Sequence, residues 1–176
     1  MAVAAGAAAW QVADRERQYR ERMSSGDLAL RDGQTFGAIE SYSGALAWRP
    51  DSMLAHLRRG EAYRQRSEFD AAARDFRDAA ELDPSAPRPL EALGEVLYQR
   101  GRYTQAADAY EARLKLDERS ADTWYKLALA RYRAGQIDHT LDALDQVAHL
   151  NDSLPDAYLL RGMCQRDKGQ IGRAHV

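Results

Sequence analysis

The sequence predicts an all-α protein, an α-solenoid of stacked helical hairpins. The composition favours helix, because 45% of the residues are hydrophobic and 30% charged, with only 5 prolines and 12 glycines. The same residue types recur every 34 residues over most of the chain. Within each unit, two segments carry apolar or small residues at the three- and four-residue spacing of an amphipathic helix.

Three columns of residues share this period. The first holds small residues, at Gly26, Gly60, Gly94, Ala128 and Gly162. The second holds mostly glycine, at Gly33, Ser67, Gly101, Gly135 and Gly169. The third holds large apolar residues, at Tyr42, Phe76, Tyr110 and Leu144. Several independent columns with one period indicate a true structural repeat.

Each unit is predicted to form two helices joined by a tight turn, because the second column places glycine where a helix end favours a left-handed conformation. In the second unit we expect the first helix in SMLAHLRRGEAYRQR and the second in FDAAARDFRDAAELD. The small residue of the first helix should let its neighbour approach closely. The ring of the second helix should fill the space against the adjoining hairpin.

The segment LGEVLYQRGRYTQAADAYEARLKLD, residues 93–117, contains L-G-x-x-L, G-x-Y-x-x-A, Y and L-x-L-D in order. This pattern resembles the tetratricopeptide repeat (TPR), and the resemblance implies a right-handed superhelix with a concave groove. The TPR array is expected over residues 19–170. It comprises complete units at 19–52, 53–86, 87–120 and 121–154 and a partial unit at 155–170.

In the family resembled, the first helix of each hairpin lines the concave groove through the second, fifth, ninth and twelfth residues of a repeat. The resemblance therefore implies a partner-binding groove of Leu54, Leu57, Glu61, Arg64, Arg88, Glu91, Glu95, Tyr98, Asp122, Tyr125, Leu129 and Tyr132. The tyrosines and leucines suggest anchor sites for an extended or helical peptide. Alternatively, some of these rings pack against the neighbouring helix.

Charge and motifs argue against other function classes. With 25 Lys and Arg against 27 Asp and Glu, the chain lacks the basic excess that nucleic acid attracts. Phosphate-loop, H-E-x-x-H, C-x-x-C and G-x-S-x-G motifs are absent from the sequence. His56 occupies a column that otherwise holds Leu90, Trp124 and Tyr158, which favours a packed histidine over a metal ligand. We therefore predict no catalytic residue, metal, cofactor or small-molecule substrate.

Two arginines depart from the repeat pattern. Arg113 stands where earlier repeats have Ala45 and Ala79, and Arg131 replaces the apolar residue seen as Leu97. We expect both arginines to snorkel at the edge of the packing. The alternative is a polar seam between the third and fourth repeats, which requires an acidic partner.

Residues 1–18 form an apolar leader followed by a charged flank. The apolar run ends at Trp10, whereas a membrane-spanning helix needs about 20 such residues. It is either an Ala-rich, fraying helix or the trailing half of a truncated membrane anchor or signal. We favour the second interpretation, which predicts a membrane tether at the N-terminus; otherwise the protein is expected in the cytoplasm.

At the other end, the repeat predicts a second helix that opens near Ile171. The last six residues, IGRAHV at 171–176, are similar to the translation of a widely used sequencing adapter. We interpret them as an artefactual tail and the chain as a fragment of a longer protein. The alternative is a genuine repeat, because Ile171 and Ala174 fit their columns.

These observations predict a non-enzymatic scaffold or adaptor that binds a protein or peptide in the TPR groove. The alternative is a regulatory or substrate-recognition region of a larger enzyme, a kinase or a glycosyltransferase, whose catalytic domain lies outside this sequence.

Overall fold

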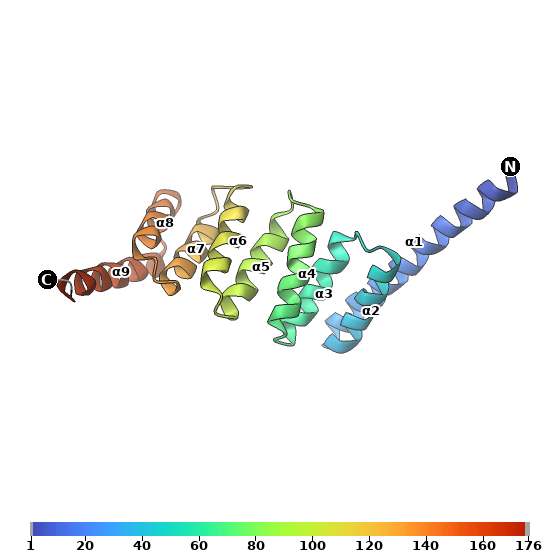
Figure 1. The fold of residues 1–176 in the computed structure, drawn as a ribbon, viewed down its shortest axis with the longest axis horizontal. Coiled ribbons are helices and arrows are strands. Elements are labelled where there is room, and N and C mark those ends of the chain that lie inside the picture. Colours follow the sequence, from blue (N-terminus) through green and yellow to red (C-terminus); the bar gives the residue numbers. More distant parts are fainter. Residues whose placement is uncertain (1, 175–176) are drawn as a thin grey trace. The chain divides into compact units, whose positions relative to one another are not determined.

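The computed structural model describes the backbone of residues 2–174 and the side chains of residues 9–169. Over this range all the regular elements are α-helices (Figure 1). They are α1 (Ala2–Arg31), α2 (Thr35–Trp48), α3 (Met53–Gln65), α4 (Phe69–Leu82), α5 (Pro87–Gln99), α6 (Tyr103–Leu114), α7 (Ala121–Arg133), α8 (Ile137–Leu150) and α9 (Pro155–Ala174). The chain forms two compact units, Met1–Pro89 and Leu90–Val176, which we call unit 1 and unit 2.

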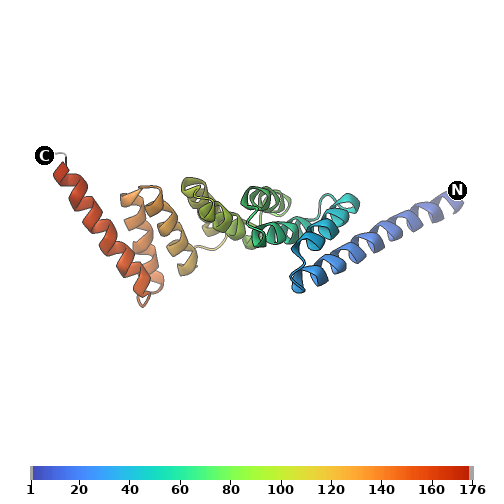
Figure 2. The same cartoon turned by 90° about the horizontal axis from the view of Figure 1, so that it is seen from below.

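Within each unit, helices that follow one another in the chain pack side by side (Figure 1, Figure 2). In unit 1, α1 packs on α2, α2 on α3, and α3 on α4; in unit 2, α6, α7, α8 and α9 follow the same order. The Ser52 hydroxyl caps α3 by accepting the Ala55 N–H at 3.2 Å, and Ser120 caps α7 in the same way. The bounds of α3 and α4 agree with the predicted hairpin.

The turn column adopts the left-handed conformation in four repeats. The φ angles are 74° at Gly33, 61° at Ser67, 78° at Gly101 and 76° at Gly135. The fifth member behaves differently, because α9 continues through Gly169 to Ala174, and the expected helix start near Ile171 is therefore wrong. Glycine permits a left-handed turn without imposing one, and no described second helix packs back on α9 to stabilise it.

The small and large columns meet inside the first three hairpins, in the pairs Gly26 with Tyr42, Gly60 with Phe76 and Gly94 with Tyr110. A Cβ placed on Gly60 would lie 2.6 Å from the Cε1 atom of Phe76, and the corresponding distance from Gly94 to Tyr110 is 2.5 Å. Both rings are buried. The ring therefore packs on the glycine of its own hairpin, whereas we had expected it to fill the space against the adjoining one. The reason is steric, because the missing Cβ leaves a notch that the ring fills.

The predicted leader and the first helix of the first repeat form one helix, α1. Its C-terminal half belongs to the core, where Tyr19 and Met23 are buried and the Tyr19 hydroxyl lies 2.7 Å from Ser52 Oγ. Farther toward the N-terminus, Trp10 and Val12 are 66% and 68% exposed. Among the described residues, no helix combines the length and apolar character that crossing a membrane requires.

The third and fourth repeats meet through a polar seam between α6 and α7. The Arg131 guanidinium donates to Glu111 Oε1 at 2.6 Å and to the His139 carbonyl at 3.2 Å. Its side chain is only 17% exposed, so the snorkelling expected for Arg131 is wrong. Arg113 is also largely covered, and its closest carboxylate is that of Asp117 at 3.7 Å. Arg131 can lie in this covered position because its hydrogen bond to Glu111 replaces hydrogen bonds to water that the guanidinium loses.

Candidate interaction faces on the first helices

The predicted groove residues lie on α3, α5 and α7, the first helices of their hairpins. Their spacing of three or four residues places them on one side of each helix. In unit 1, we define the first-helix face as Leu54, Glu61, Arg64 and Arg88. In unit 2, we define it as Glu91, Glu95, Tyr98, Asp122, Tyr125, Leu129 and Tyr132.

Leu57 does not lie on this surface. It is only 3% exposed, so a partner cannot reach it, contrary to the expectation from the repeat. The following repeats have Glu91 and Tyr125 at the same position, and both remain partly exposed. Burial of an aliphatic side chain at the margin of the core stabilises the fold, whereas a carboxylate or phenol there keeps its polar end in water.

The unit 1 face is dominated by ion pairs. Glu61 accepts hydrogen bonds from Arg88 at 2.6 Å and from Arg58 at 3.1 Å, and its side chain is 13% exposed. Leu54 is 45% exposed. Most of the charge on this face is therefore engaged within the fold.

Beside this face lies a cavity of about 430 Å³ between α1 and α3, lined by Asp27, Leu30, Arg31, Arg58 and Gln65. Asp27 accepts a hydrogen bond from the Tyr42 hydroxyl at 2.8 Å. Burial and this hydrogen bond raise the pKa of Tyr42 above its ordinary value. Asp27 also lies 3.8 Å from Arg58 Nε, so cations and an acid face the cavity together.

In unit 2, Lys126 links α7 to α5. Its ammonium donates to Glu91 at 2.5 Å and to Glu95 at 2.8 Å. Burial alone lowers the pKa of Lys126, but the two hydrogen bonds outweigh it and raise the pKa above its ordinary value. Lys126 was not among the predicted groove residues, yet it neutralises one of the two carboxylates there.

The three tyrosines of the unit 2 face are half-buried, and Tyr98 and Tyr132 have partners within the fold. The Tyr132 hydroxyl donates to Asp167 of α9 at 2.8 Å, and the Tyr98 ring meets Tyr103 edge to face with centroids 5.2 Å apart. Burial, Asp156 and Tyr98, in that order, raise the pKa of Tyr125. These rings thus pack within the unit and still expose part of their surface to solvent.

The same face continues onto α9, which the predicted set omitted. Asp156 and Leu159 follow Asp122 and Tyr125 by one 34-residue period, and Leu159 is 67% exposed. Extending the repeat positions into the partial fifth unit would have found both residues.

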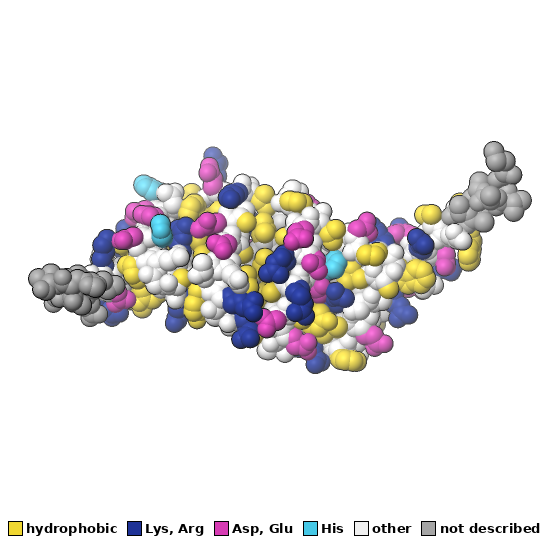
Figure 3. Space-filling view, in the orientation of Figure 1, with side chains coloured by type: hydrophobic (Ala, Val, Ile, Leu, Met, Phe, Trp, Pro, Cys, Tyr) yellow, Lys and Arg dark blue, Asp and Glu magenta, His cyan; other side chains and the backbone are white. Residues whose placement is uncertain are grey.

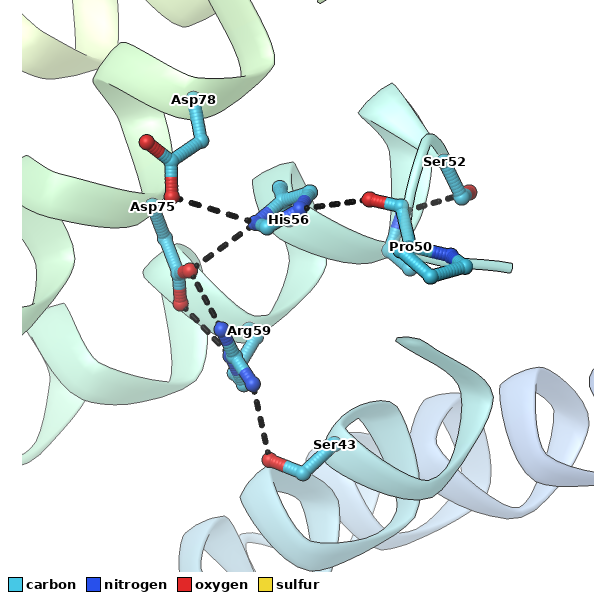
Figure 4. A network of polar contacts seen from close by, with 8 residues as sticks. Ser43, Pro50, Ser52, His56, Arg59, Asp75 and Asp78 are labelled. Atoms are coloured by element: carbon cyan, nitrogen blue, oxygen red, sulfur yellow. Dashed lines mark hydrogen bonds and ion pairs between the residues drawn. The ribbon is translucent and has the colours of Figure 1, made fainter. Parts of the chain in front are cut away.

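Away from these faces, His56 belongs to a polar network between α3 and α4 (Figure 4). Its Nδ1 atom lies 3.1 Å from Asp75 and 3.7 Å from Asp78, and its Nε2 atom lies 3.1 Å from the Pro50 carbonyl. Among the described side chains, these three form the one group with metal-ligand spacing. However, Arg59 donates to both Asp75 oxygens, at 2.7 and 2.8 Å, which already neutralises this buried carboxylate. We therefore interpret the group as a packing network.

The comparisons with known proteins agree with this architecture. A family model described as TPR repeat matches residues 60–99 and 94–135. Residues 60–135 therefore contain tetratricopeptide repeats. No curated protein matches the TPR chain by sequence.

Solved structures show the same fold. MamA is 23% identical with a TM-score of 0.81, over 88% of this chain and 84% of that one. YrrB, a TPR protein with an unusual peptide-binding site, is 16% identical with a TM-score of 0.77, over 92% and 83%. The first TPR of Spaghetti (RPAP3), bound to an HSP90 peptide, is 18% identical with a TM-score of 0.63, over 68% and 94%. The predicted all-α TPR solenoid is therefore confirmed.

Proposed function

We propose that this TPR protein is a non-enzymatic adaptor that holds a peptide segment of a protein partner on its first-helix faces. The unit 2 face carries the proposal. Tyr125, Leu129 and Tyr132 lie three or four residues apart on α7, and each is partly exposed. Aromatic side chains on a rigid helix suit anchoring, because they offer a large contact area at a small entropic cost.

Two of the structural neighbours support this use of the fold. The YrrB structure is described as having a peptide-binding site, and the RPAP3 domain is bound to a peptide. The charge distribution makes a protein a better partner than nucleic acid. The chain has a formal net charge of -2, and Figure 3 shows basic and acidic side chains intermixed over the visible surface of each unit.

Alanine substitution tests the proposal. Tyr125→Ala and Tyr132→Ala should each weaken binding of the partner by about 1 to 2 kcal/mol, because each removes an aromatic anchor. The partner is first captured as a peptide from a random display library selected against the whole chain. Its dissociation constant is then measured by fluorescence anisotropy, while circular dichroism verifies that helicity is retained.

Phe36→Ala serves as the matched control. Phe36 is 69% exposed but lies on α2, a second helix, so its removal should leave affinity unchanged. Equal affinities for both tyrosine variants and the parent chain would refute the assignment of binding to the unit 2 face. A loss in the Phe36 variant as large as in the tyrosine variants would place binding elsewhere.

A further inference from the structure

We propose that the unit 2 face selects a protein segment in which Lys or Arg stands close to a large aliphatic or aromatic side chain. This inference rests on the proposed function and specifies the chemistry of its partner. Two observations carry it, namely unpaired carboxylates at one end of the face and an exposed apolar floor beside them.

The carboxylates gather at the N-terminal ends of α5, α7 and α9. Glu91, Asp122 and Asp156 lie there, and Lys126 pairs with Glu91 and with Glu95, which stands farther along α5. Asp122 and Asp156 are exposed, and among the described side chains neither has a hydrogen bond or an ion pair. Both stand in the first turn of a helix.

The apolar floor lies next to these charges. Tyr125 and Leu129 are partly exposed on α7, and on α9 Leu159 is 67% exposed and Met163 partly exposed. Asp122 and Tyr125 are three residues apart on α7, as are Asp156 and Leu159 on α9, so each carboxylate lies on the same side of its helix as the apolar residue that follows it. A ligand seated on the floor therefore places its flanking residues beside the acidic end.

The geometry also sets a spacing. Asp122 and Leu129 are seven residues apart on α7, which separates them by about 10 Å along the helix axis. An extended peptide covers this distance in about three residues. The preferred ligand thus has its basic residue within about three positions of its apolar anchor.

The opposite end of the face is more nearly balanced. Arg166 pairs with Asp167 at 2.9 Å, and Asp167 also accepts the Tyr132 hydroxyl. Interaction with the Tyr98 side chain raises the pKa of Arg133. The unpaired carboxylates Asp122 and Asp156 lie at the acidic end, so charge complementarity there favours a basic segment and disfavours nucleic acid or an anionic membrane surface.

A peptide selection tests the inference. A random 16-residue display library is selected on the immobilised whole chain, and the enriched sequences are compared with the unselected library. We expect enrichment of Lys or Arg within about three positions of Leu, Phe, Tyr or Trp. Enriched binders that lack a basic bias would overturn the inference while leaving the proposed function intact. Failure to enrich any peptide would instead reject the proposed function and this inference with it.

Charge removal then locates the contact. The double variant Asp122→Asn and Asp156→Asn should lower the affinity of the best selected basic peptide about tenfold at low salt, at roughly threefold for each carboxylate. The control is Asp108→Asn with Asp142→Asn, which removes the same charge from exposed positions on α6 and α8. The control should change affinity less than about twofold. Equal losses in both double variants would assign the effect to net charge and refute a specific contact.

Discussion

The substitution Gly60→Ala tests the packing of ring on glycine found in the first three hairpins. The added Cβ would lie 2.6 Å from Cε1 and 2.8 Å from Cδ1 of Phe76, a ring with no exposed surface. Alanine in a helix interior contributes about 1 kcal/mol over glycine. Overpacking of a buried ring costs about 2 to 3 kcal/mol when the ring cannot move away. We therefore expect a net loss of about 1 to 2 kcal/mol in unfolding free energy.

Two further variants make this prediction sharper. Gly162 holds the same repeat position on α9, but a Cβ there would meet nothing within 4 Å. Gly162→Ala should therefore stabilise the chain by up to about 1 kcal/mol. The fourth repeat has the buried pair Ala128 and Leu144, so the double variant Gly60→Ala with Phe76→Leu should be more stable than Gly60→Ala alone.

Urea unfolding followed by circular dichroism at 222 nm measures all three variants, with the midpoints compared because a repeat array need not unfold in two states. A higher midpoint for Gly60→Ala than for the parent chain would refute the reasoning.

Three other predictions concern stability. Ser67 is the one described non-glycine residue with a positive φ, so Ser67→Gly should raise unfolding free energy by about 1 kcal/mol, whereas Gly101→Ser should lower it; both are measured by urea unfolding. Asp75→Ala should lower the unfolding free energy by about 3 kcal/mol, because it leaves Arg59 largely buried without its carboxylate partner. Asp145→Ala removes one partner of an exposed ion pair and should lower it by less than about 1 kcal/mol. Equal losses in thermal unfolding of the two variants would contradict this prediction. Amide hydrogen exchange should be faster in α9 than in α4, because helices of a repeat array depend on their neighbours; equal protection would argue against that dependence.

Much of the fold could be predicted from sequence because the same residue pattern recurs in each repeat. The columns that begin at Gly26 and Gly33 identified helices, turns and register, since glycine has few other reasons to recur every 34 residues. At Gly169 the repeat pattern does not predict the structure correctly. A residue that permits a turn does not produce one, and the helix continues there.

The candidate faces were predictable in position but not in accessibility. The repeat placed Leu57 and Tyr125 at equivalent positions, yet Leu57 is buried and Tyr125 is partly exposed. Their exposure differs because burial stabilises an aliphatic side chain, whereas a phenol keeps its polar end in water. The sequence did not indicate the role of Lys126, because its partners Glu91 and Glu95 belong to another helix and the sequence of one helix does not record what packs against it.

The amino-acid sequence alone determined the helical repeat, the hairpin boundaries and the positions of the first-helix faces, because these depend on residue size and periodicity along the chain. Tertiary structure decided the rest. Pairing of Arg131 with Glu111, the engagement of Lys126 and the unpaired state of Asp122 and Asp156 depend on side chains that meet across helices. Whether a charge is neutralised depends on which side chains lie close to it in space, and the order of residues along the chain does not specify those neighbours.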